Sequence, residues 1–116
     1  MDKARELCDK FNLLSTENPI LAERIFQDQG YRFLRTGQTS NAIELFKMGT
    51  EAYPNSANSW DCLAEAYMAS RNNEMAIKYY KKTLEVLPND TTTSGELKNI
   101  IRTNTPEILQ RLEQQN

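Results

Sequence analysis

The sequence repeats itself at a period of 34 residues without a gap. Shifting the chain by one period superimposes Phe26 on Trp60, Gly30 on Ala64, Phe33 on Tyr67, Ala42 on Ala76, Ile43 on Ile77, Phe46 on Tyr80, and Pro54-Asn55 on Pro88-Asn89. A period of this length, with aromatic, small and proline positions recurring in order, is typical of helix–turn–helix units that stack on one another. A chain built from such units is expected to act through a surface rather than through a catalytic site.

The apolar residues within each period have helical spacing. Trp60, Ala64 and Tyr67 lie at offsets of four and three residues, which places them on one face of a helix. The prolines that close the two periods end their helices, because proline disfavours helix at the residue before it. We therefore predict helices at residues 23–36, 40–53, 57–70 and 73–87. If each pair is antiparallel, Gly30 faces Ala42, and Trp60 is predicted to be largely buried.

These positions resemble the signature of the tetratricopeptide repeat (TPR) family. The second copy carries Trp60, Leu63, Ala64, Tyr67, Ala76, Tyr80 and Pro88. The first copy carries Phe26, Gly30, Phe33, Ala42, Phe46, Gly49 and Pro54. The chain departs from the family pattern at Gln29 and Thr83. The resemblance implies an all-α, right-handed TPR-type helical solenoid with repeats at 23–56 and 57–90.

The flanking segments are predicted to cap this stack, so that residues 1–116 form one TPR-like domain. An amphipathic N-terminal capping helix is expected within 1–18, ended by Asn18-Pro19. Residues 91–116 are expected to form C-terminal capping helices. Thr93 and Glu96 make a capping box for the first of them, and Thr105-Pro106 starts another. Terminal caps cover the apolar faces that a two-repeat stack would otherwise expose.

Composition narrows the classes of function. The net charge of −2 argues against a nucleic-acid partner, and no apolar run approaches the roughly 20 residues that cross a bilayer. The charged N-terminus lacks the features of a signal peptide, so the protein is expected to be cytoplasmic if the chain is complete. Histidine is absent, and the two cysteines match no metal or redox motif. We expect no enzyme activity, no catalytic residues, no metal and no cofactor.

The candidate binding surface is the concave groove lined by the first helix of each repeat. Its predicted residues are Arg24, Gln27, Tyr31, Leu34, Arg35, Asn58, Asp61, Glu65 and Met68. Tyr31 and Met68 would supply apolar contacts, with the charges setting the polarity of the ligand. The alternative is that Asp61 and Glu65 form inter-repeat ion pairs or an ordinary solvated face. The acids make the groove unlike the TPR clamps that grip C-terminal carboxylates with Lys and Asn.

The sequence thus predicts a non-catalytic interaction or scaffold module that binds a peptide or protein through its concave face. The style of the second repeat is also similar to bacterial TPR modules attached to serine hydrolases of the beta-lactamase-like or esterase kinds. An accessory domain excised from such a hydrolase is therefore the alternative. A homodimer formed through the terminal helices is a further one.

Overall fold

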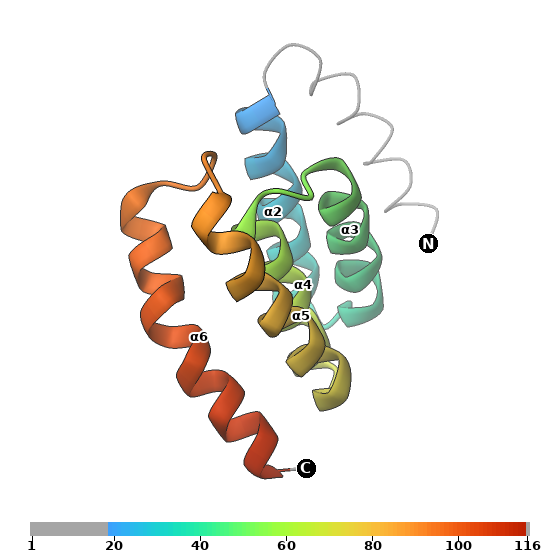
Figure 1. Ribbon diagram of the computed structural model, residues 1–116. Helices are drawn as coiled ribbons and strands as arrows, with labels where there is room; N and C mark the ends of the chain where they lie inside the picture. The colour runs from blue at the N-terminus through green and yellow to red at the C-terminus, as the bar shows by residue number, and fades with distance from the viewer. Residues whose placement is uncertain (1–18, 116) are drawn as a thin grey trace.

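The computed structural model describes residues 19–115, which fold entirely into helices joined by short turns (Figure 1). The elements are α2 (Pro19–Arg35), α3 (Thr39–Ala52), α4 (Ala57–Ala69), α5 (Asn73–Val86), the 3-10 helix η1 (Leu87–Asn89) and α6 (Gly95–Gln115). The prediction of an all-α helical solenoid of the TPR type is confirmed over this part of the chain. The predicted capping helix within 1–18 lies outside the described residues.

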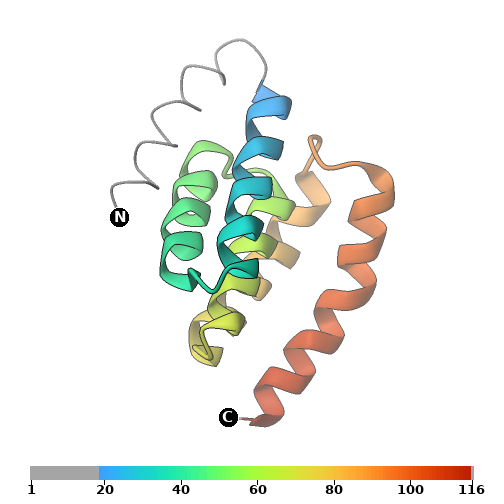
Figure 2. The same cartoon turned by 180° about the vertical axis from the view of Figure 1, so that it is seen from behind.

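The helices stack in chain order. α2 pairs with α3 and α4 pairs with α5, while α3 contacts α4 and α5 contacts α6. Contacts also join α2 to α4 and α4 to α6, so these three helices line the same side of the stack. Figures 1 and 2 place α3 and α6 at opposite ends of the arrangement. The groove expected from two helices therefore has a third helix, α6, along it.

Local sequence explains where α2 ends and where α4 and α5 begin. Gly37 has a φ of +78°, a conformation that glycine adopts without strain, and it follows the end of α2. The side chains of Ser56 and Asn72 accept hydrogen bonds from the first turns of α4 and α5. Such caps satisfy amide groups that have no partner within the helix. The predicted helices at 40–53, 57–70 and 73–87 are confirmed to within one residue at each end.

Two boundary predictions were wrong, both at a proline. α2 begins at Pro19 rather than at residue 23, because the fixed φ of proline suits the first helical position and its missing N–H is not needed there. Residues 95–115 form one helix, α6, with Pro106 inside it, rather than separate capping helices. A proline inside a helix costs about 3 kcal/mol. The buried stripe of Ile101, Thr105, Leu109 and Leu112 offsets that cost by packing against the stack.

The core lies between the two helix pairs. Its fully buried side chains include Leu45, Leu63 and Tyr80. A Cβ atom added to Gly30 would overlap the ring of Phe46, so the absence of a side chain at Gly30 makes room for this ring. Trp60 is partly exposed and is not among the fully buried core side chains.

Candidate binding groove

The structure brings part of the predicted groove together between α2 and α4. A depression of about 450 Å³ is lined by Tyr31, Leu34, Arg35, Glu65, Met68 and Ala69. Five of these six residues were predicted from the sequence, and they come from α2 and α4. Arg24, Gln27, Asn58 and Asp61 do not line this depression. The predicted stripe is thus divided, with its C-terminal half forming the hollow.

Tyr31 forms a polar link between the repeats. Its hydroxyl donates a hydrogen bond to the Glu65 carboxylate at 2.7 Å and accepts one from the Cys62 thiol at 3.5 Å. The ring also packs edge-on against Phe46, with centroids 5.6 Å apart. Burial, followed by the neighbouring Cys62 and Glu65, raises the pKa of Tyr31 above its usual value. Tyr31 is therefore held in place before any ligand binds, and its hydroxyl already donates one hydrogen bond and accepts another.

The N-terminal half of the stripe is occupied by a polar network that sequence reasoning missed. Buried Glu23 accepts hydrogen bonds from Gln27 Nε2 at 3.1 Å and from Ser59 Oγ at 3.2 Å. The Ser56 hydroxyl donates to the same carboxylate oxygen. Predicted groove residue Gln27 thus supports an internal contact. Glu23 is the first residue of the predicted repeat. It is polar, so the apolar periodicity used to place the helices gave no indication that it is buried.

Asp61 is half-buried on α4. Burial raises the pKa of Asp61 to about 7, and the negative charge of Glu65 adds to the shift. The one ion pair among the described residues joins Lys82 to Glu85, so exposed Arg24 and Arg35 do not pair with Asp61. The predicted alternative of inter-repeat ion pairs for Asp61 and Glu65 was wrong within the described chain. Glu65 is partnered by the Tyr31 hydroxyl instead.

The remaining predicted residue, Asn58, is half-buried near the start of α4. Its position on α4 precedes that of Asp61 by about one helical turn, which fits the predicted stripe.

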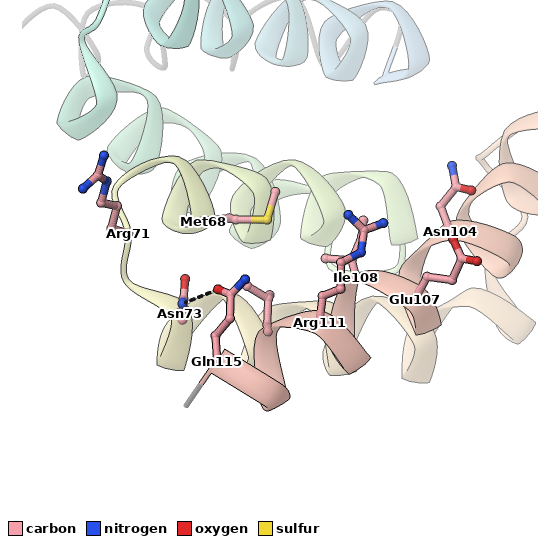
Figure 3. Close-up of a pocket in the computed structure, with 9 residues that line it drawn as sticks. Met68, Arg71, Asn73, Asn104, Glu107, Ile108, Arg111 and Gln115 are labelled. Atoms are coloured by element: carbon pink, nitrogen blue, oxygen red, sulfur yellow. Dashed lines mark hydrogen bonds between the residues drawn. The ribbon is translucent and has the colours of Figure 1, made fainter.

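A second and larger hollow continues the groove toward α6 (Figure 3). Its volume is about 710 Å³, and it is lined by Met68, Arg71, Asn73, Asn104, Glu107, Ile108, Arg111, Leu112 and Gln115. The Asn73 side chain donates to Gln115 Oε1 at 3.3 Å, which ties the end of α6 to the start of α5. Met68 lines both hollows, so they adjoin at this residue.

The sequence contains a helical pattern that indicates the α6 wall of the second hollow. Asn104, Ile108, Arg111 and Gln115 follow one another at offsets of four, three and four residues, the spacing of one helix face. The prediction assigned residues 91–116 to capping, with a homodimer contact as an alternative, and did not include them in the groove. A single continuous helix gives this face its length, and continuity through Pro106 depends on packing.

Other kinds of site find little basis in residues 19–115. They contain no group of three or more Cys, Asp or Glu side chains placed to hold a metal ion. Over the same residues, no helix combines the length and apolar character that crossing a membrane requires.

Comparisons with known proteins agree with the repeat pattern. Residues 57–90 match the family model described as tetratricopeptide repeat, and these residues are the second predicted repeat. The chain is similar to "Tetratricopeptide repeat protein 37" of Xenopus laevis, with 33% identity over 60 residues. That alignment covers 52% of this chain and 4% of the relative, so the chain spans a small part of that protein's length. Both matches support the TPR assignment, and neither indicates a bacterial hydrolase.

Proposed function

We propose that this chain, whose residues 57–90 match a tetratricopeptide repeat, is a non-catalytic module that binds a peptide or protein segment along α2, α4 and α6. TPR domains generally mediate protein–protein interaction, which sets the class of function. The two hollows supply the surface on which such a segment would lie. The hydrolase alternative gains no support from the matches, and we do not propose it.

The observation that carries the proposal is an apolar strip shared by the three helices. Leu34 on α2, Met68 on α4 and Ile108 on α6 are each half-buried, and each lines one of the hollows or both. Half-buried apolar side chains in a depression can bury their remaining area against a ligand, at about 25 cal/mol for each Å². Methionine adapts well to different partner side chains.

The charges beside the strip would set the orientation of the segment. Arg35, Arg71 and Arg111 are exposed and line the hollows, and none forms an ion pair with a described residue. Glu65 lies nearby but already accepts the Tyr31 hydrogen bond. Complementary charges of this kind contribute more to specificity and association rate than to affinity.

In this proposal the domain consists of repeats 23–56 and 57–90, with α6 serving as both cap and third groove helix. The two roles are compatible because they use adjoining faces of α6, which share Leu112. The stripe of Ile101, Leu109 and Leu112 is buried in the stack. Ile108 and Arg111 face the hollow.

Selection of groove ligands from a random peptide library, followed by affinity measurement with matched variants, tests the proposal. Met68→Gln removes the central apolar contact and should weaken binding of the selected peptide by about tenfold or more. Ile100→Gln is the matched control, because Ile100 is 48% exposed on α6 and lines neither hollow.

The opposite pattern would overturn the groove assignment. If Ile100→Gln abolishes binding and Met68→Gln does not, the interaction uses the outer face of the terminal helix. Sedimentation of the free protein would then show whether a homodimer forms through that face.

A further inference from the structure

A separate cavity lies among α3, α4 and α5. Its volume is about 590 Å³, and it shares no residue with the two groove hollows. It is lined by Lys47, Thr50, Glu51, Trp60, Leu63, Lys78, Tyr79, Lys81, Lys82 and Glu85, which together we call the lysine pocket. The pocket therefore needs an explanation independent of the groove.

Stacked aromatic rings support one wall of the lysine pocket. Tyr79 stacks on Trp60 with centroids 5.9 Å apart and on Tyr67 with centroids 5.5 Å apart. Trp60 and Tyr67 are two turns apart on α4, about 10 Å of helix rise, so Tyr79 lies between them. The Trp60 indole N–H also donates to the Pro54 carbonyl oxygen at 2.8 Å. The wall is thus held in place from several sides.

Positive charge is concentrated around this wall. Four of the five lysines in the described part of the chain line the pocket, although the whole chain has a net charge of −2. The pocket has two carboxylates, and one of them, Glu85, lies 3.5 Å from Lys82. Lys47, Lys78 and Lys81 have no carboxylate at ion-pair distance among the described residues. The Lys78 ammonium lies 5.4 Å from the centre of the Tyr79 ring, and Tyr67 raises the pKa of Lys47. These lysines thus contact aromatic residues of the wall, while no described carboxylate pairs with their charges.

We propose that the lysine pocket binds an acidic segment of polypeptide. Its Asp or Glu side chains would contact Lys47, Lys78 and Lys81, and an apolar side chain would lie against the exposed part of Trp60. Clusters of one sign of charge attract oppositely charged ligands and raise their rate of association. Mixed recognition of this kind, with a buried aromatic beside polar contacts, is usual at protein interfaces.

The same geometry disfavours a nucleic acid in the pocket. Single-stranded nucleic acids are held largely by base stacking on open aromatic faces. Both faces of Tyr79 are covered by other rings, and the Lys82 ammonium lies 5.5 Å from the centre of the Trp60 ring. The carboxylates of Glu51 and Glu85 would also oppose a continuous row of phosphates. A peptide that alternates acidic and uncharged side chains needs no base stacking, and it can place its uncharged side chains beside Glu51 and Glu85.

Trp60 makes the test direct, because it is the single tryptophan of the chain and lies in the pocket wall. Its emission would be followed during titration with a synthetic peptide that repeats Ser-Glu-Leu-Asp. The neutral control peptide has Gln for Glu and Asn for Asp. We expect a saturable emission change with the acidic peptide and at least about a tenfold weaker response to the neutral one.

Two charge-reversal variants locate the binding. Lys78→Glu with Lys81→Glu should weaken binding of the acidic peptide by at least about tenfold. Arg24→Glu with Arg32→Glu makes the same charge change on α2, outside the pocket and both groove hollows, and should alter binding by less than about twofold. All four side chains are exposed, so circular dichroism should show both variants folded.

An equal loss of affinity for the acidic peptide in the two variants would overturn the pocket proposal and indicate general electrostatic attraction. Saturable binding of oligothymidylate without binding of the acidic peptide would overturn it in favour of a nucleic acid. Met68→Gln should leave the acidic peptide unaffected, so failure of the groove proposal and failure of the pocket proposal are distinguishable.

Discussion

The Tyr31 hydroxyl donates a hydrogen bond to the Glu65 carboxylate at 2.7 Å, and the two residues are separated by one 34-residue period. They occupy equivalent positions in the first helices of the two repeats. A bond between them fixes the distance from α2 to α4 on the groove side. Because both side chains are partly buried, losing one partner leaves a polar group poorly solvated.

Tyr31→Phe should therefore destabilise the protein, by about 1–2 kcal/mol in urea unfolding followed by circular dichroism. Glu65→Gln keeps an acceptor and should cost less. The double variant should be more stable than the sum of the two losses predicts, because Glu65→Gln weakens the same bond that Tyr31→Phe removes. Strict additivity would show that the bond does not form in solution.

Gly30→Ala should lower the melting temperature, although alanine favours a helix over glycine by about 1 kcal/mol. The added methyl group would overlap the ring of Phe46, which is buried, so the ring would have to shift within the core. Gly49→Ala is the matched control, because its added Cβ would contact nothing within 4 Å and the backbone is helical. Gly49→Ala should raise the melting temperature, and an equal rise for Gly30→Ala would contradict the packing.

Asp61 should make stability depend on pH. Its folded pKa of about 7 is above the unfolded value of 3.8, so the folded state binds a proton more tightly between these values. Stability then falls as pH rises from about 4 to about 7, and the full loss persists above pH 7. Asp61→Asn should exceed the parent at pH 8 by about 1 kcal/mol or more, and match it near pH 4.

Urea unfolding at the two pH values measures this difference. Asp28→Asn is the control, since Asp28 is exposed on α2 and its replacement should change stability little at either pH. A benefit of Asp61→Asn that is equal at both pH values would mean that the charge of Asp61 is not its cause.

Asp90 should make stability depend on pH in the opposite direction to Asp61. Burial alone would raise its pKa, but hydrogen bonds from Thr93, Thr92 and Ala57 outweigh it and lower the pKa to about 2. A lowered folded pKa stabilises the protein above the unfolded value, and the contribution is lost as pH falls from about 4 to about 2.

Asp90→Ala should cost about 1–3 kcal/mol at pH 7, because the Ala57 amide, which donates to Asp90 Oδ2 at 2.9 Å, loses its acceptor at the start of α4. The difference between variant and parent should shrink at pH 2. Asp90→Asn retains an acceptor oxygen and should lose less at pH 7. A loss for Asp90→Asn as large as that for Asp90→Ala would show that the charge, rather than the acceptor, carries the stabilisation.

The period of 34 residues is enough to establish the helical hairpins. Aromatic residues such as Phe33 and Tyr67 recur on one helix face, and caps such as Ser56 mark helix starts through local hydrogen bonds. Apolar periodicity and capping depend on residues within a few turns of each other, so they can be read along the chain.

Long-range contacts determined the continuity of α6 and the partners of individual polar and aromatic side chains. The stripe of Leu109 and Leu112 packs against the stack and keeps α6 continuous through Pro106, where the local signal favoured a break. That packing brings Ile108 beside Met68 and extends the groove. Likewise, Ser56 and Ser59 donate to Glu23, and Tyr31 donates to Glu65, from positions more than 30 residues away. Tyr79 stacks on two residues of another helix. Sequence patterns register which face of a helix is apolar, whereas the partner of each polar or aromatic side chain depends on which helices meet in three dimensions.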